Sequence, residues 1–391
     1  MKAKYDVIVI GAGPIGIYVS FKLAQAGFSV LAVEEDACIG KPRFCTGLIG
    51  KEAFDRFDLP KEAIENEFNS AWINSPLGFK VCLKTKDSQV YVTDRTKFDQ
   101  GLYHRAEKAG VKFLMNCHCQ RLRVNDSYVE GGIRFDGSII KVRSEIAILA
   151  TGIKYNLHRL SGFKAPENFL DCSQVQVCGE FGDNIEIFLG NRVAPHSFAW
   201  TVPLKGNKLR IGISTRQNSP LFLKSFLNYL KSKGRIDKSL STEIMRRPIP
   251  LEPIKKTYNN RILVVGDAAG QVKPTTGGGI YFGLLCADLA AKAVSGAFKK
   301  KNFKATSLRH YETAWKKEIE FDMTMSIYLR KLLANFNDKQ IDGLVRFLSE
   351  EPIQQLIAKY ADFNHHGRFI KELIKFPLFW KSFYQILATR G

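Results

Sequence analysis

The sequence has 391 residues, of which 45% are hydrophobic and 25% are charged, a balance typical of soluble globular domains and not of fibrous or disordered chains. No run approaches the roughly 18 consecutive apolar residues of a membrane-spanning helix, so a spanning protein is not expected. The 58 Lys and Arg outnumber the 38 Asp and Glu, and the resulting net charge of +20 suits anionic partners such as lipid head groups.

The first predicted elements form a βαβ unit. Tyr5–Ile10 is an apolar run except for Asp6, a pattern that is typical of a parallel strand buried on both faces. A glycine-rich turn follows, then a helix from about Pro14 to Ala26 and a second strand from Phe28 to Val33. A unit of this kind is a building block of doubly wound parallel sheets.

Later segments extend the same sheet. Arg95–Ala109 is predicted to be a helix that ends at Gly110, because glycine is common just after a helix. Ile146–Leu149 and Ile262–Val265 are short apolar strands, each followed within three residues by Gly. Together these pieces predict an α/β fold with a doubly wound, Rossmann-like sheet assembled from distant parts of the chain.

Two other regions have different patterns. Segments within 68–93 and 171–249 alternate polar and apolar residues between turn signals, which predicts an inserted, mainly antiparallel β domain that holds the substrate. From Ser307 onward large apolar residues recur every four positions, which predicts a C-terminal helical region over 307–391. Residues 1–67, 94–170 and 250–306 then form the discontinuous Rossmann-like domain.

A glycine motif separates the first strand from the first helix. In Gly11-Ala12-Gly13-Pro14-Ile15-Gly16, Gly11 permits a tight turn, Gly13 lets backbone approach a pyrophosphate, and Gly16 allows close helix–strand packing. The helix that opens at Pro14 and Ile15 presents its positive N-terminal end to the phosphates. Glu34, just after the second strand, is placed to accept the ribose hydroxyls of an adenosine. The unit therefore predicts a dinucleotide site.

Residues 261–280, RILVVGDAAGQVKPTTGGGI, indicate which dinucleotide binds. A buried strand delivers Asp267 to its carboxyl end, where the carboxylate can accept hydrogen bonds from a ribityl chain, which FAD has and NAD lacks. Gly278 and Gly279 open a helix at Ile280, whose positive end would face the flavin pyrimidine ring. The turn at Gly152 follows another strand on the same side. The predicted cofactor is FAD, and no metal is predicted.

The motifs GAGPIG, TDRTKFDQGL, LATG and GDAAGQVKPTTGGGI together resemble those of the geranylgeranyl reductase family, within the flavoproteins related to p-hydroxybenzoate hydroxylase. The resemblance covers most of the chain, and residues 311–347 look like the family's C-terminal helices. It implies an FAD-dependent reductase that saturates C=C bonds of a geranylgeranyl-type lipid or a prenylated quinone with hydride from reduced flavin.

A cysteine-containing segment carries part of this resemblance. Arg43, Cys45, Thr46 and Gly47, in the run PRFCTG, are similar to the loop that these reductases place beside the isoalloxazine ring, although the family often has a Gly one position later. The resemblance implies that all four contact the cofactor. It also makes Cys45 a candidate catalytic residue that orients the ring or helps to deliver a proton, whereas the residue type alone is equally consistent with a small buried side chain.

A second segment resembles the family's substrate-lining signature. Phe198, Trp200 and Pro203 occupy three positions of the Pro-x-x-Tyr-x-Trp-x-Phe-Pro pattern, with Phe198 in place of Tyr and Val202 in place of Phe. Because alternate residues of a strand share a face, Phe198 and Trp200 can form one apolar wall for an isoprenoid. An ordinary sheet core is the alternative.

Two more residues are assigned to FAD by the resemblance. Arg95 lies four positions before Asp99 on one predicted helix, so a surface ion pair is the simplest interpretation, but the resemblance assigns Arg95 to the FAD phosphates. The strand around Cys119 would pass the adenine through its backbone. The eight cysteines lack metal-site spacing and are expected to be free thiols.

Other functions share these cofactor motifs. The segment at Phe198 is also similar to one in flavin-dependent halogenases, so a flavin monooxygenase or halogenase is one alternative. A quinone oxidoreductase without an iron–sulfur cluster is another, because no cysteine follows Cys286. The reductant is either NAD(P)H or an electron-carrier protein, since no second convincing GxGxxG motif is present.

The charge pattern and the C-terminal segment indicate which partners the protein binds and where in the cell it is located. No block of like charge exceeds Lys299–Lys301, so no nucleic acid partner is expected. Residues 369–384 combine large aromatic side chains with interspersed lysines, which suits peripheral contact with an anionic membrane. The chain enters a strand almost at once, and we expect a cytoplasmic protein, with peripheral attachment to the inner membrane face as a further expectation.

Overall fold

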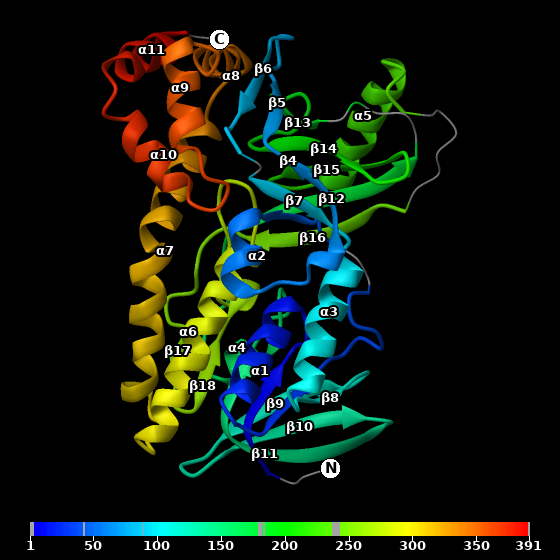
Figure 1. Cartoon of the computed structure of the whole chain (residues 1–391), viewed down its shortest axis with the longest axis vertical. Coiled ribbons are helices and arrows are strands. Elements are labelled where there is room, and N and C mark those ends of the chain that lie inside the picture. The colour runs from blue at the N-terminus through cyan, green and yellow to red at the C-terminus, as the bar shows by residue number, and fades with distance from the viewer. Residues whose placement is uncertain are drawn as a thin grey trace.

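The computed structural model describes residues 4–41, 44–87, 89–178, 182, 184–236 and 243–389. Its strands form a sheet with a parallel centre, a large mixed sheet and a small three-stranded sheet. Figure 1 shows the first two sheets in separate stacked parts, with helix α7 (Ala305–Leu333) running alongside and leading to the C-terminal helices. The predicted α/β class is therefore confirmed.

The first sheet has the order β17-β18-β11-β1-β2-β8, and its five strands from β18 to β8 pair in parallel. β10 and β9 continue it as an antiparallel ribbon along the N-terminal half of β11. The strands are β1 (Lys4–Ile10), β2 (Val30–Val33), β8 (Lys112–Leu114), β9 (His118–Val124), β10 (Val129–Phe135), β11 (Ser138–Leu149), β17 (Tyr258–Asn259) and β18 (Ile262–Val264).

The apolar run of β1 is explained by burial on both faces of this sheet. Val7 and Val9 join the core built with helices α1 (Pro14–Gln25), α3 (Arg95–Lys108) and α6 (Ile280–Lys299). Ile8 and Ile10 face the opposite way, into a second core beneath the β9–β10 ribbon and helix α4 (Asn156–Leu160). Successive side chains of a strand point to opposite faces, so none of the four residues from Val7 to Ile10 can be polar without burying that group.

Helix α6 corrects one expectation. It has 20 residues and an 18-residue window of mean hydropathy 1.3, which is long and apolar enough to cross a membrane. The expectation that no segment approaches this length is therefore wrong for α6. Of that window, 61% is buried inside the protein, where α6 packs against α1 and α7. This is the setting of a core helix.

The large sheet has the order β16-β12-β15-β14-β13-β5-β6, and only β13 and β5 pair in parallel. Helix α5 (Ser219–Ser232) covers one face through Leu223 and Phe226. The strands are β5 (Ser70–Asn74), β6 (Lys80–Lys84), β12 (Phe169–Cys178), β13 (Ile185–Leu189), β14 (Phe198–Leu204), β15 (Lys208–Thr215) and β16 (Met245–Pro250).

The small sheet joins segments that the sequence interpretation assigned to different domains. Strands β3 (Leu48–Gly50) and β4 (Ile64–Phe68) both pair with β7 (Val90–Thr93). Helix α2 (Lys51–Phe57) and the short 3-10 turn η1 (Lys61–Ala63) connect β3 to β4. The strands of residues 68–93 thus divide between this sheet and the large one.

The C-terminal helices pack on one another and on the edge of the large sheet. In α7, Tyr311, Trp315, Ile319 and Met323 are all buried, as the four-residue period predicts. The Ser75 hydroxyl, just after β5, donates to the Asp342 carboxylate of α8 and fixes these helices to the sheet. The remaining helices are α8 (Asp338–Phe347), α9 (Glu351–Tyr360), α10 (His366–Leu373) and α11 (Pro377–Ala388).

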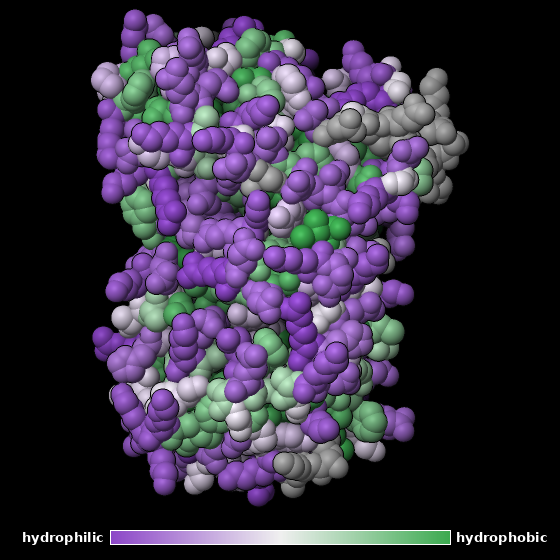
Figure 2. Space-filling view, in the orientation of Figure 1, coloured by the Kyte–Doolittle hydropathy of each residue, from purple (hydrophilic) through white to green (hydrophobic). Residues whose placement is uncertain are grey.

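The surface reflects the composition. Figure 2 shows a face on which hydrophilic residues predominate and hydrophobic residues gather only in small groups. Such a face is expected of a protein whose large apolar side chains lie mostly inside.

Candidate functional site: a cavity at the glycine turn

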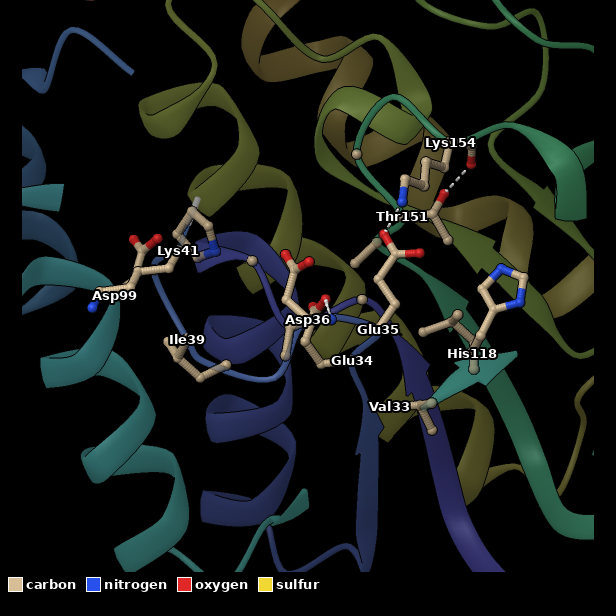
Figure 3. Close-up of a pocket in the computed structure, with 18 of the residues that line it drawn as sticks. Val33, Glu34, Glu35, Asp36, Ile39, Lys41, Asp99, His118, Thr151 and Lys154 are labelled. Carbon is tan, nitrogen blue, oxygen red and sulfur yellow. Dashed lines mark hydrogen bonds and ion pairs between the residues drawn. The ribbon is translucent and has the colours of Figure 1, made fainter. Parts of the chain in front are cut away.

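A cavity of about 230 Å³ opens at the carboxyl ends of β1, β2 and β11. In open α/β sheets this edge is where ligands bind. Figure 3 shows Glu34, Glu35 and Asp36 side by side on the segment after β2, with Lys41 and Asp99 toward one end and Thr151 and Lys154 toward the other. Of the predicted residues, those that line it are Gly11, Gly13, Pro14, Glu34, Cys45, Arg95, Cys119 and Gly152.

The three glycines of the first turn have different surroundings. Gly11 has φ +100°, and a Cβ there would lie 2.4 Å from the Ala150 carbonyl oxygen. A Cβ on Gly16 would lie 1.9 Å from the Gly11 carbonyl oxygen, so α1 and the turn are in direct contact. A Cβ on Gly13, by contrast, meets no atom within 4 Å. The turn therefore packs tightly on one side and leaves backbone accessible to a ligand on the other.

The Glu34 carboxylate fastens this turn to the end of β2. Its Oε2 accepts a hydrogen bond from the Ala12 N–H at 2.5 Å, and its Oε1 accepts one from the Asp36 N–H at 3.0 Å. Burial raises the pKa of Glu34, against the opposing effect of these two hydrogen bonds. Lys154 forms an ion pair with the neighbouring Glu35 across the mouth of the cavity.

Arg95 and Asp99 form a buried ion pair on the cavity wall. Arg95 Nη2 donates to Oδ1 and Oδ2 of Asp99 at 2.9 and 3.0 Å, and the two side chains are only 12% and 9% exposed. Burial opposes the charge of Arg95, but Asp99 and the Cys45 thiol outweigh it and raise its pKa. The simple surface-pair interpretation is therefore wrong, and a buried cation faces the cavity.

The cysteine-containing segment links the cavity to the large sheet and to the small sheet. Cys45 lines the cavity, whereas Thr46 and Gly47 do not and serve as anchors. The Thr46 carbonyl accepts from Arg210 Nη1 of β15 at 2.6 Å, and the Gly47 carbonyl accepts from the Thr93 hydroxyl of β7 at 3.0 Å. Arg43 lies outside the described residues, so its predicted contact stays a prediction.

The second cofactor motif lies next to the cavity and is joined to it by Arg247 of β16. Arg247 lines the cavity and reaches Asp267 Oδ2 at 3.9 Å. Asp267 Oδ1 in turn lies 2.8 Å from where a Cβ of Gly279 would be, so a side chain at position 279 would have to displace this carboxylate. Asp267, Gly279 and the start of α6 at Ile280 thus meet at one point.

Two predicted cofactor residues have packing roles in this structure. The Ile15 side chain lies where Cβ atoms on Gly266 and Gly283 would be, and so holds α1 against α6 and the turn η2 (Gly266–Ala269). A Cβ on Gly278 would lie 2.9 Å from Lys273 Cε. Neither Ile15 nor Gly278 lines the cavity.

The predicted substrate wall lies apart from this cavity. The rings of Phe198 and Trp200 in β14 are 5.6 Å apart on one face, as the alternation predicts, while Pro203 is buried. None of the three lines the cavity. Trp200 instead packs in a cluster with Leu48 and Phe363, and its indole Nε1 is buried without a hydrogen-bond partner among the described residues.

Cys119 and several unpredicted residues complete the cavity. Cys119 in β9 is buried, which raises the pKa of its thiol to about 12, so it is not a reactive thiolate. Sequence reasoning missed Arg247, Lys154 and Lys41, because none belongs to a motif. The only sequence signal was the local excess of basic residues, which does not point to a position.

Known proteins match most of the chain. The family model described as lycopene cyclase protein matches residues 6–354. The chain is 33% identical to a digeranylgeranylglycerophospholipid reductase of Methanocaldococcus jannaschii, over 88% of this chain and 91% of the relative. It is 30% identical to digeranylgeranylglycerophospholipid reductase 2 of Methanothermobacter thermautotrophicus, over 90% and 94%.

Solved structures share the fold. A geranylgeranyl bacteriochlorophyll reductase-like protein from Thermoplasma acidophilum matches with a TM-score of 0.85 at 22% identity, covering 98% of this chain and 99% of its own. The p-nitrophenol 4-monooxygenase of Pseudomonas putida matches with a TM-score of 0.75 at 15% identity, covering 91% and 97%. The halogenase PltM, in a variant solved with FAD, matches with a TM-score of 0.70 at 14% identity, covering 97% and 90%.

The fold and the cavity define a flavin-dependent oxidoreductase. Two of the alternative enzyme types considered from the sequence, monooxygenases and halogenases, share the fold but match it less well than the reductase-like protein. The chain belongs to the geranylgeranyl reductase family, with the digeranylgeranylglycerophospholipid reductases as relatives over most of its length.

Proposed function

We propose that this protein is an FAD-dependent reductase that saturates C=C bonds of a geranylgeranyl-type lipid. The observation that carries the proposal is the similarity, over about nine-tenths of the chain, to enzymes named digeranylgeranylglycerophospholipid reductases. A prenylated quinone is the second substrate class that the same chemistry would admit. The reductant is NAD(P)H or an electron-carrier protein.

The residues at the cavity fit FAD. The open side of Gly13 and the positive end of α1 suit a pyrophosphate, and the buried guanidinium of Arg95 adds a fixed positive charge on the same wall. The carboxylate of Asp267 lies 3.9 Å from Arg247, which lines the cavity, and is the proposed acceptor for the ribityl hydroxyls.

Bound FAD, once reduced, supplies the hydride for an alkene carbon. An isolated alkene has no carbonyl on which the protein can stabilise charge, so the chain's task is to orient the substrate and exclude water. Phe198 and Trp200 present adjacent apolar rings for this purpose. Cys45, between the cavity and the large sheet, is the proposed group that orients the ring or helps to deliver a proton.

The decisive experiment is anaerobic incubation of the purified, dithionite-reduced protein with digeranylgeranylglycerophospholipid, followed by mass spectrometry. We expect mass gains of two hydrogens per saturated bond. Unchanged lipid in the presence of fully loaded FAD would contradict the proposal. A product that forms only when oxygen is admitted would favour the monooxygenase or halogenase alternative.

We also propose peripheral contact with an anionic membrane on its cytoplasmic face, through α11. Trp380, Tyr384 and Leu387 are 45%, 67% and 39% exposed and share one helix face, with exposed Lys375 and Lys381 nearby. Changing Tyr384 and Leu387 to Ser should weaken co-sedimentation with phosphatidylglycerol vesicles several-fold. The same change at the exposed pair Tyr328 and Leu332 of α7 is the control.

A further inference from the structure

Lys273 is a buried lysine beside the second glycine turn, which is formed by Gly277, Gly278 and Gly279. Its side chain is almost completely enclosed, at 3% exposed. Its backbone N–H donates to the Gly278 carbonyl at 3.0 Å, and its carbonyl accepts from the Gly277 N–H at 2.8 Å. Its Cε lies 2.9 Å from where a Cβ of Gly278 would be. The ammonium group is thus held against the turn that opens α6.

Among the described residues, the direct partners of the ammonium group are neutral. It donates one hydrogen bond to the Phe363 carbonyl at 2.5 Å, and it lies 4.0 Å from the centre of the Phe363 ring. No carboxylate among the described residues lies within the 4.0 Å of an ion pair. A buried ammonium normally requires a compensating anion, because desolvation of an unpaired charge is costly.

The segment that covers Lys273 is firmly anchored. It connects α9 to α10 and contacts three other helices. Asn364 donates to Glu52 of α2 at 3.4 Å, His365 contacts Asp322 of α7 at 2.8 Å and the Tyr281 hydroxyl of α6 at 3.1 Å. The position of Phe363, and with it the site of the ammonium group, is therefore fixed by the fold.

We propose that Lys273 is the cation that stabilises reduced flavin at the second glycine turn, Gly277–Gly279. This inference rests on the proposed function, together with the sequence prediction that the turn at Gly278 and Gly279 faces the pyrimidine ring of FAD. Two-electron reduction of a flavin with uptake of one proton leaves one negative charge on the ring. An ammonium group in a site of low dielectric, already desolvated and oriented, attracts that charge strongly. Lys273 would therefore favour reduced over oxidised FAD.

The titration of Lys273 is consistent with this role. Burial lowers its pKa to about 7, against smaller opposing effects of Asp362 and Asp322. An anion beside the ammonium raises the pKa of a lysine again, so reduction of the cofactor would keep Lys273 charged.

The test is the two-electron midpoint potential of bound FAD in the wild type and in Lys273→Met, measured at the same pH. We expect the preference for reduced over oxidised FAD to fall at least tenfold in Lys273→Met. For a two-electron couple this is a midpoint potential about 30 mV more negative than that of the wild type. Lys292→Met removes one exposed charge from α6 and should leave the potential unchanged. Lys273→Arg keeps the positive charge and should largely retain the wild-type midpoint potential.

The outcomes separate this inference from the function on which it rests. A Lys273→Met protein that binds FAD with the wild-type potential overturns the role of Lys273 and leaves the reductase proposal intact. A wild type that binds no FAD overturns both. If the Met variant does not fold, Lys273→Gln replaces it, and loss of oxidised FAD from both neutral variants would show a structural role only and overturn the inference.

Discussion

The carboxylate of Asp99 holds the guanidinium of Arg95 against the wall of the cavity, with Arg95 Nη2 within 3.0 Å of both carboxylate oxygens. The two residues are one turn apart on α3, and both are nearly buried. Asp99 occupies only some of the five N–H donors of the guanidinium. The other donors of Arg95 remain available to an anionic ligand.

Replacing Arg95 should therefore affect stability and FAD binding separately. Arg95→Ala leaves Asp99 buried without a partner, which should lower the free energy of unfolding by about 3–5 kcal/mol. The double variant with Arg95→Met and Asp99→Asn should recover most of this loss, yet still bind FAD at least tenfold more weakly. Urea unfolding and FAD fluorescence titration measure the two effects. Wild-type affinity in the double variant would exclude Arg95 from the FAD site.

The glycine turn allows a sharper comparison between two single methyl groups. Gly13→Ala adds a Cβ where no atom lies within 4 Å, and the backbone at φ −67° accepts alanine. Its unfolding free energy should stay within about 0.5 kcal/mol of wild type, while FAD affinity falls. Gly16→Ala places its Cβ 1.9 Å from the Gly11 carbonyl oxygen and should lose both stability and FAD.

The measurements are thermal unfolding and flavin absorption after reconstitution. If Gly13→Ala retains FAD at wild-type affinity, the open side of the turn does not face the cofactor. Gly296, on the far part of α6 with nothing within 4 Å, offers a neutral Gly→Ala control.

The glycine turn could be predicted from the sequence because each glycine acts on neighbours that are close along the chain. Strand β1 was predictable for a similar reason, since burial on both faces demands consecutive apolar residues, as in Val7–Ile10. The burial of the Arg95–Asp99 pair was not predictable, because the i, i+4 spacing is identical on a surface and in a core. What decides it is the segment around Gly40 and Cys45, which folds over α3.

The place of Arg247 at the cavity and the burial of Lys273 could not be predicted either, and the reason differs from that for the Arg95–Asp99 pair. Arg247 reaches the cavity only because β16 pairs with β12 at the edge of the large sheet. Lys273 lies within a recognised motif, but its burial depends on Phe363, which is 90 residues further along the chain. Long-range packing of this kind leaves no local pattern.

Trp200 and Gly212 give a test of the predicted substrate wall. A Cβ on Gly212 in β15 would lie 2.1 Å from Trp200 Cζ2, so Gly212→Ala must displace the indole. We expect a stability loss of about 1–3 kcal/mol and a clear fall in the rate of lipid reduction, with unchanged FAD binding. Anaerobic single-turnover oxidation of reduced enzyme by lipid measures the rate. A rate equal to wild type would remove Trp200 from the substrate site.

His366, at the start of α10, should make stability depend on pH. Its Nδ1 lies 2.7 Å from the Thr275 hydroxyl in the second glycine turn. Burial lowers its pKa from 6.5 to about 4, assisted by the positive charge of Lys273 and opposed by Asp322 and Asp362. The folded state therefore resists a proton that the unfolded chain accepts.

The sign of the effect follows from linkage. The contribution of neutral His366 is fully present above pH 6.5 and is lost as the pH falls toward 4, by about 3 kcal/mol at about 1.4 kcal/mol for each pKa unit. Subtracting the unfolding free energy of His366→Gln from that of the wild type, at each pH from 7.5 to 4, removes the titrations common to both. We expect this difference to decrease as the pH is lowered from 7.5 to 4. A difference that stays constant over this range would show that this imidazole is free to protonate in the folded protein.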